Sequence, residues 1–198
     1  MTTITVSSPP RRVLGDVVSE SLLGDVFLVV GAAALVGLLA QVSIPLGFTP
    51  VPITGQTLGV LLAGTALGWR RAGLSMALYV AAGVAGVPWF AQHSHGLPTA
   101  TFGYLLGFVL AGSLLGWLAG RGHDRTVRHA LSSMLLGEAA IYAVAVPWLA
   151  VSLHVSLVHA VTLGLTPFVI GDLIKALLAG LVLPASWRVV DRLSRAKG

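Results

Sequence analysis

The sequence of 198 residues contains no cysteine and few charged side chains. The absence of cysteine excludes a disulfide framework, a thiolate zinc site and a cysteine nucleophile. Charged residues make up only 10% of the chain, whereas a soluble domain has about 25%. Hydrophobic residues make up 56%, and the mean hydropathy is +0.90. These values indicate a polytopic membrane protein with no stretch left over for a separate soluble domain.

Motifs for hydrolysis and metal binding are also missing. There is no G-x-x-x-x-G-K-[ST] phosphate loop, so the chain cannot hydrolyse ATP by that route, and no H-E-x-x-H motif occurs. His93 and His95 are separated by one residue, but no third ligand follows nearby, which disfavours a metal site. We therefore expect neither an enzyme nor a bound cofactor.

Six apolar stretches are candidates for membrane-crossing helices, which need about 20 mostly apolar residues. These predicted spans cover residues 25–44, 53–69, 72–88, 100–120, 130–153 and 158–187. The second and third are short, with a tight basic turn, Trp69-Arg70-Arg71, between them. Pro147 is expected to kink the fifth span, and Pro167 to start or kink the sixth. The predicted organisation is a tail over 1–24, a membrane domain over 25–187 and a second tail over 188–198.

The first span is expected to be retained. Asp16, Glu20 and Asp25 lie between the Arg11-Arg12 pair and the apolar run. A signal peptide instead places its basic region directly before the apolar core.

Basic residues indicate the side of the membrane on which each loop lies. Every Lys and Arg except Lys175 falls in the N-terminal tail, the second loop, the fourth loop or the C-terminal tail. These residues are Arg11, Arg12, Arg70, Arg71, Arg121, Arg125, Arg128, Arg188, Arg192, Arg195 and Lys197. Because cytoplasmic loops carry the excess of Lys and Arg, we predict an all-α protein of the cytoplasmic membrane with six spans and both termini in the cytoplasm. The net charge of +5 then faces anionic lipid rather than nucleic acid.

Three ionisable residues fall inside predicted spans: Glu138, Asp172 and Lys175. Asp172 and Lys175 are three residues apart, which puts them on one helix face together with Phe168 and Ala179. Charged side chains inside a membrane are costly and usually mark a functional site. The pair suits a small ligand with donors and acceptors, or coupling to protons or ions. The alternatives are an ion pair that only satisfies itself and, for Glu138, a hydrogen bond near Pro147.

Several segments together resemble the BioY family, the biotin-binding substrate components of energy-coupling factor (ECF) transporters. Residues 44–64 read IPLGFTPVPITGQTLGVLLAG and closely resemble the first-loop signature of that family. GVPWFA at 86–91, TFGYLLGF at 101–108 and GDLIK at 171–175 resemble later segments in the same order. The chain departs from the family at 99–104, where it reads TATFGY in place of a run similar to G-P-T-G-G-Y. No arginine occurs in the preceding loop, which leaves the partner of the biotin carboxylate open.

The resemblance implies a six-helix bundle with a biotin pocket near the outer surface, capped by the first and third loops. It implies that Asp172 and Lys175 line the pocket, and Glu138 could reach a similar depth. The apolar part of biotin needs an aromatic wall, for which the candidates are Phe48, Trp89, Phe90, Tyr104 and Tyr142.

The resemblance also implies partners, namely a transmembrane coupling subunit and ATPase subunits. The first span would pack on the coupling subunit through Ala33, Gly37 and Ala40, although ordinary packing within the bundle explains that stripe equally well. The alternative function is a self-sufficient carrier for biotin or another small vitamin, facilitative or driven by protons, with Glu138 and Asp172 as relay groups.

Overall fold

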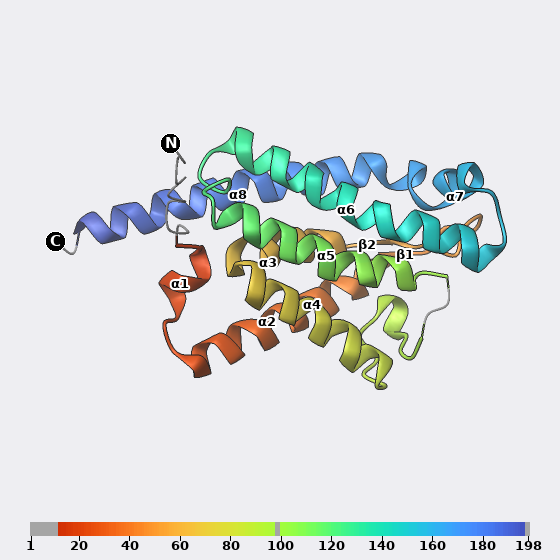
Figure 1. The fold of residues 1–198 in the computed structure, drawn as a ribbon, viewed down its shortest axis with the longest axis horizontal. Coiled ribbons are helices and arrows are strands. Elements are labelled where there is room, and N and C mark those ends of the chain that lie inside the picture. The colour runs from red at the N-terminus through yellow and green to blue at the C-terminus, as the bar shows by residue number, and fades with distance from the viewer. Residues whose placement is uncertain (1–11, 98–99, 197–198) are drawn as a thin grey trace, which may run out of the picture.

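Most of the chain between its tails is helical in the computed structural model, which describes residues 12–97 and 100–196 (Figure 1). In chain order the helices are α1 (Leu14–Val18), α2 (Leu22–Gln41), α3 (Gln56–Leu67), α4 (Trp69–Val84), α5 (Phe102–Ala119), α6 (Val127–Leu153), α7 (Leu157–Gly164) and α8 (Val169–Ala196). Two 3₁₀ turns, η1 (Ala91–His93) and η2 (Thr166–Phe168), interrupt the connections. A short antiparallel pair, β1 (Ser43–Ile44) and β2 (Ile53–Thr54), lies between α2 and α3.

Within the described residues, four helical stretches are long and apolar enough to cross a membrane. They are Leu22–Gln41, Phe102–Ala119, Val127–Leu153 and the combined stretch Leu157–Ala196. Helices α3 and α4 contain 12 and 16 residues. At 1.5 Å per residue they are roughly 18 Å and 24 Å long, less than the hydrocarbon thickness of about 30 Å. The prediction of a helical membrane protein is confirmed, and each predicted span contains a helix, but two of those helices are short.

The last predicted span differs most from the structure. It is not one helix, because α7 ends at Gly164 and α8 begins only after the η2 turn that contains Pro167. Proline has no backbone N–H to continue a helix, which explains the break at this position. At its other end α8 continues to Ala196, so most of the predicted C-terminal tail is helical.

The basic turn predicted at Trp69-Arg70-Arg71 is also shifted. These three residues form the first turn of α4, and the chain reverses at Gly68 instead. Gly68 has a φ of +79°, a conformation that glycine adopts without a steric penalty.

Helix α5 lies at the centre of the bundle and packs on α3, α4 and α6 (Figure 1). Glycines on opposite faces of α5 allow this close approach. A Cβ on Gly107 would lie 2.8 Å from the carbonyl oxygen of Ile141 in α6, and one on Gly116 would lie 2.3 Å from the backbone of Gly68. Small residues of this kind are typical of helix contacts inside membranes, where backbones pack closely.

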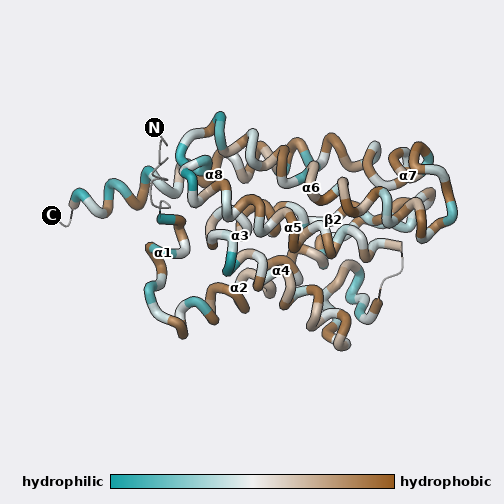
Figure 2. The backbone as a smooth tube through the Cα atoms, in the orientation of Figure 1, coloured by the Kyte–Doolittle hydropathy of each residue, from teal (hydrophilic) through white to brown (hydrophobic). Residues whose placement is uncertain are grey.

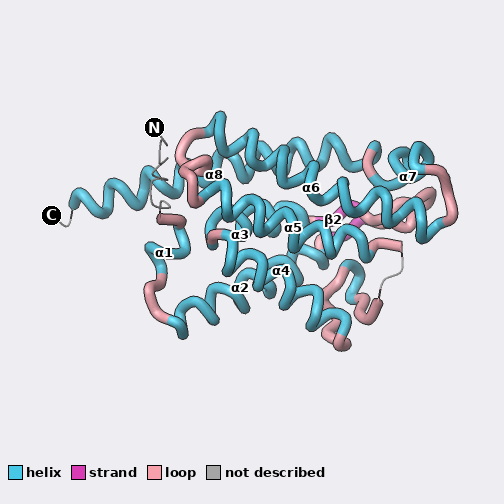
Figure 3. The backbone as a smooth tube through the Cα atoms, viewed as in Figure 1, coloured by secondary structure: helices cyan, strands magenta, loops and turns pink. Residues whose placement is uncertain are grey.

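The two ends of the bundle have different compositions. Helix α1, the α5–α6 connection and the last turns of α8 lie at one end, which we call the basic end (Figure 1). Hydrophilic residues gather there, whereas the helices between the ends are mostly apolar (Figure 2). The β-hairpin, the α4–α5 loop and α7 lie at the opposite end, the loop end (Figure 3).

Candidate ligand site

A cavity opens inside the bundle near the loop end. The space between its walls, including the open mouth, is about 650 Å³. Its walls come from the β-hairpin, the starts of α3 and α5, the α4–α5 loop, α6 and the η2–α8 segment. The residues are Val51, Pro52, Thr54, Gln56, Thr57, Phe90, Ala91, Ser94, Thr101, Tyr104, Leu105, Phe108, Ile141, Tyr142, Phe168, Asp172 and Lys175.

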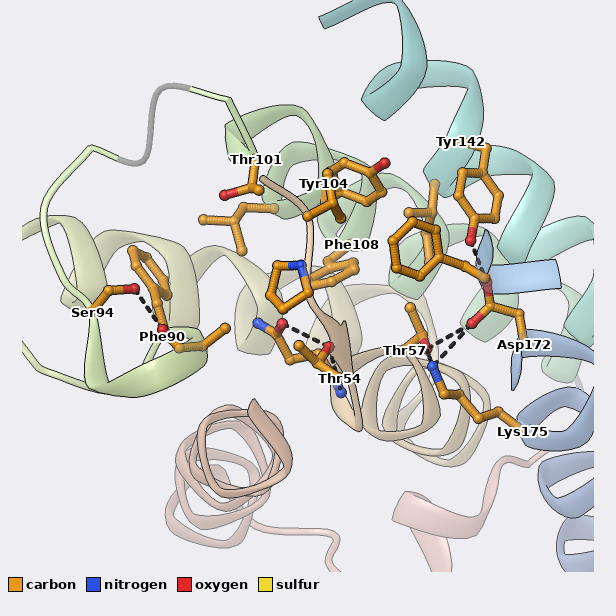
Figure 4. Close-up of a pocket in the computed structure, with 17 residues that line it drawn as sticks. Thr54, Thr57, Phe90, Ser94, Thr101, Tyr104, Phe108, Tyr142, Asp172 and Lys175 are labelled. Atoms are coloured by element: carbon orange, nitrogen blue, oxygen red, sulfur yellow. Dashed lines mark hydrogen bonds and ion pairs between the residues drawn. The ribbon is translucent and has the colours of Figure 1, made fainter. Parts of the chain in front are cut away.

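A network of charged and hydroxyl groups forms one end of the cavity (Figure 4). Lys175 Nζ lies 3.0 Å from Asp172 Oδ1 and donates to Thr57 Oγ1 at 2.8 Å. The hydroxyl of Tyr142 donates to Asp172 Oδ2. Asp172 is buried and Lys175 is only partly exposed. The acid and the base therefore neutralise each other, and hydroxyl groups from two other helices add hydrogen bonds to the pair.

The local fold explains why these groups meet. Asp172 lies in the first turn of α8, where the helix dipole favours a negative charge. The three-residue spacing then places Lys175 on the same face, as predicted from the sequence. Thr57 lies in the first turn of α3, directly after the β-hairpin, and Tyr142 reaches in from the middle of α6. The site thus joins three separate helices.

The other end of the cavity is polar but uncharged. Ser94 and Thr101 lie there beside Phe90, on the far side of the cavity from Asp172 (Figure 4). The surface between the two ends is largely apolar and includes Phe108 and Phe168, both buried. This arrangement fits an elongated ligand with a donor–acceptor head, an apolar body and a polar tail.

The α4–α5 loop, which supplies Phe90 and Ser94, is held by the side chain of Gln41. The Gln41 amide donates to the carbonyl oxygens of Trp89 at 3.1 Å and Phe90 at 3.3 Å. It also accepts from the backbone N–H of His93 at 3.2 Å. One side chain at the end of α2 therefore holds the loop at three residues.

A second set of bonds holds the same loop from α4. The Tyr79 hydroxyl accepts from Gln56 Nε2 at 2.7 Å and donates to the carbonyl oxygen of Trp89 at 3.2 Å. Trp89 Nε1 donates in turn to the carbonyl oxygen of Tyr79 at 2.9 Å. Because Gln56 lines the cavity, these bonds connect the loop directly to the site.

Five of the side chains predicted for the site line the cavity: Asp172, Lys175, Tyr104, Phe90 and Tyr142. The other three are not among the lining residues. Phe48 is 63% exposed on the first loop. Trp89 packs on Tyr79, at 5.3 Å between ring centroids. Glu138 is buried beside the charged pair.

Sequence reasoning missed several polar residues of the cavity, namely Thr54, Gln56, Thr57, Ser94 and Thr101. The first three belong to the quoted stretch ITGQT, so the signal was present in the sequence. Nothing in the pattern showed which of its hydroxyl and amide groups would point inward.

The small-residue stripe on α2 faces the interior. Ala33 and Ala40 are fully buried, and a Cβ on Gly37 would lie 3.1 Å from the Trp89 ring. In this arrangement the stripe makes ordinary contacts within the bundle, the second of the two interpretations given above. Ala33 and Ala40 are covered by other parts of the described chain, and packing of the stripe on a coupling subunit stays a prediction.

Fold and site together define a helical membrane protein with a ligand cavity inside its bundle. Within the described ranges 12–97 and 100–196, no group of three or more His, Asp or Glu side chains could hold a metal ion. The BioY family matches residues 11–192, and the chain belongs to that family.

Individual relatives agree with this assignment. The biotin transporter BioY of Rhizobium etli is 33% identical over 161 residues, which cover 76% of this chain and 86% of the relative. The biotin transporter BioY of Thermotoga maritima is 38% identical over 152 residues, covering 75% and 87%. The fold is similar to that of a solved S-component for biotin from an ECF-type ABC transporter. The TM-score is 0.75 at 23% identity, covering 84% of this chain and 92% of that one.

Proposed function

We propose that this protein binds biotin in the cavity and delivers it across the cytoplasmic membrane as the substrate-specific component of an ECF-type transporter. The observation that carries the proposal is the buried Asp172–Lys175 pair at one end of an apolar cavity. The cyclic urea of biotin has two N–H donors and one carbonyl acceptor. A carboxylate accepts from such donors and an ammonium donates to such a carbonyl. Relatives that cover most of this chain are named biotin transporters.

The cavity suggests one orientation for the ligand. With the urea at Asp172 and Lys175, the bicycle and the valeryl chain lie along the apolar surface beside Phe108 and Phe168. The carboxylate then reaches Ser94 and Thr101, whose hydroxyl groups can donate to it. This assigns the carboxylate to neutral donors, because no Lys or Arg occurs between Arg71 and Arg121.

The membrane arrangement is part of the same proposal. We infer six crossings formed by α2, α3, α4, α5, α6 and α8, with the basic end in the cytoplasm and the cavity toward the outside. The placement of nearly all Lys and Arg at the basic end supports this orientation. Since the sequence contains no phosphate loop, uptake driven by ATP requires ATPase subunits and a coupling subunit. The solved S-component with a similar fold comes from an ECF-type ABC transporter.

Titration of the purified protein with biotin tests the central claim. The protein is freed of bound ligand in detergent and titrated by calorimetry, with thiamine and riboflavin as controls for other vitamins. We expect saturable binding of biotin with one site per chain and no binding of either control. A protein that stays folded and binds none of the three vitamins contradicts the proposed function.

Reconstitution separates this function from the alternative of a self-sufficient carrier. Vesicles that contain only this protein are loaded with buffer, and uptake of labelled biotin is followed with and without an imposed proton gradient. The proposal expects no accumulation in either case. Accumulation driven by the gradient would identify a proton-coupled carrier instead.

A further inference from the structure

Glu138 is a buried carboxyl group with no hydrogen-bond partner in the described part of the chain. Its side chain belongs to α6, and the residue is 6% exposed. Both oxygens, Oε1 and Oε2, are buried and make no hydrogen bond to the described residues. Buried polar groups in native proteins are nearly always satisfied, so an exception calls for an explanation.

The packing of α6 on α8 places Glu138 opposite Lys175. Tyr142 donates to Asp172, and Leu131 packs directly on Gly180, so the two helices run antiparallel. Glu138 lies one helical turn from Tyr142 toward Leu131. Lys175 lies about one turn from Asp172 toward Gly180. Interpolation between these two contacts therefore places Glu138 at the same height along the helix pair as Lys175. Glu138 also interacts electrostatically with both Asp172 and Lys175, which agrees with this placement.

Lys175 has a donor to spare in this arrangement. An ammonium group carries three N–H donors. Two of them are used by Asp172 Oδ1 and Thr57 Oγ1. Asp172, by contrast, is crowded, because it accepts from Tyr142 and Lys175 and lies 3.5 Å from the Thr57 hydroxyl.

A cyclic urea on Asp172 changes this balance. Its two N–H groups compete for the carboxylate oxygens that Lys175 and Tyr142 now occupy. If the ammonium turns to the urea carbonyl, it loses contact with its present counter-ion. An ammonium in a buried site without a carboxylate partner is strongly unfavourable.

We propose that Glu138 is a positioning residue that becomes the carboxylate partner of Lys175 when the ligand occupies Asp172. In the bound state Glu138 contacts Lys175 and not the ligand, which agrees with its absence from the described cavity lining. The inference rests on the proposed function, since the urea is that of biotin. It assigns the unpartnered carboxyl a role in the bound state only.

Two substitutions of Glu138, one that removes the carboxyl group and one that keeps it, test the inference. We compare biotin affinity in the wild type, Glu138→Gln and Glu138→Asp, with Ser133→Ala as a matched control. Ser133 is buried on the same helix and lies outside the cavity lining. We expect Glu138→Gln to weaken biotin binding roughly tenfold. We expect Glu138→Asp to retain most of the affinity, and Ser133→Ala to match the wild type.

The ligand-free protein provides the second readout. Because Glu138 makes no hydrogen bond to the described residues, Glu138→Gln should leave the melting temperature of the ligand-free protein unchanged while it lowers the affinity. In a Lys175→Gln background the same change should cause no further loss, since the group on which it acts is gone.

Two outcomes contradict the role of Glu138 but leave the proposed function standing. One is a wild type that binds biotin and a Glu138→Gln variant that binds it equally well. The other is an equal loss in Glu138→Gln and Glu138→Asp, which would indicate a requirement for shape rather than charge. Absence of biotin binding by the wild type would instead contradict the proposed function itself.

Discussion

Among the described residues that line the cavity, Asp172 is the only one with a negative charge. Asp172→Asn keeps the size of the side chain but leaves Lys175 without its counter-ion and offers the urea one acceptor in place of two. Truncating one member of a buried charge pair costs about 2–5 kcal/mol. We therefore expect a loss of biotin affinity of at least roughly 30-fold, measured by titration.

The control for this change lies on the same helix. Asp191 is exposed near the basic end of α8, and Asp191→Asn removes an identical charge far from the cavity. It should bind biotin as the wild type does. Equal affinities for the wild type, Asp172→Asn and Asp191→Asn would rule out the assigned role of Asp172.

Tyr142 orients the carboxylate of Asp172 from the neighbouring helix. Tyr142→Phe removes its hydrogen bond to Oδ2 but keeps the ring that lines the cavity. A hydrogen bond to a charged group contributes about 1.5–3 kcal/mol, so we expect biotin affinity to fall by roughly 10- to 100-fold. Isothermal titration measures the change, and a circular dichroism spectrum like that of the wild type excludes misfolding. An undiminished affinity would show that Asp172 does not need this donor.

At the scale of elements, the α4–α5 loop depends on Gln41 in a different helix. Gln41→Ala removes the bonds to Trp89, Phe90 and His93 at once. Since Phe90 and Ser94 reach the cavity from this loop, a loosened loop should release biotin faster. We expect the dissociation rate to rise about tenfold, with a smaller change in the association rate.

Stopped-flow measurement of both rates checks this expectation. His95→Ala is the matched control, because His95 is exposed in the same loop and does not line the cavity. If both variants release biotin at the rate of the wild type, Gln41 does not hold the loop in a way that matters for the ligand.

The sequence could predict contacts between residues that are close along the chain, but not contacts between separate helices. The Asp172–Lys175 pair lies within one helix, so its spacing alone was sufficient. Thr57 and Tyr142 reach the same site from α3 and α6, and no local pattern specifies how three helices are rotated against one another. The inward-facing stripe on α2 had the same ambiguity, because small residues suit internal packing and partner packing alike.

The break between α7 and α8 shows a further limit. Apolar composition runs through 158–187 without a gap, and composition was the basis for a single span there. Pro167 supplied a local signal for an interruption. That α7 forms a separate short helix depends on contacts with other elements, such as the hydrogen bond from the Tyr104 hydroxyl to the carbonyl oxygen of Gly164.

Across the whole molecule, an ion-pair network joins the N-terminal segment to the bundle at the basic end. Arg71 lies 2.6 Å from Asp16 of α1 and 2.7 Å from Asp25 of α2, and its side chain is only 17% exposed. Arg71→Ala leaves two carboxylates without their partner and should destabilise the protein by about 1–3 kcal/mol. Melting in detergent should show a lower Tm.

Arg70 is a close control for Arg71. It is the preceding residue, also arginine, but its side chain is exposed and stacks on Trp69 at 5.0 Å from the ring centroid. Arg70→Ala should change the Tm much less, because exposed contacts contribute little to stability. Equal effects of the two substitutions would mean that the network around Arg71 is not a structural anchor.

The proposed orientation of the molecule can be tested with introduced cysteines, because the natural chain has none to interfere. His95→Cys places a thiol in the loop at the loop end, and Ser194→Cys places one in the last turns of α8 at the basic end; both positions are exposed. A maleimide that cannot cross the membrane should label only His95→Cys in intact cells and both variants in lysed cells. The reverse pattern would put the basic end outside, against the distribution of Lys and Arg. Labelling of both in intact cells would place the two ends on the same side and contradict the odd number of crossings proposed between them.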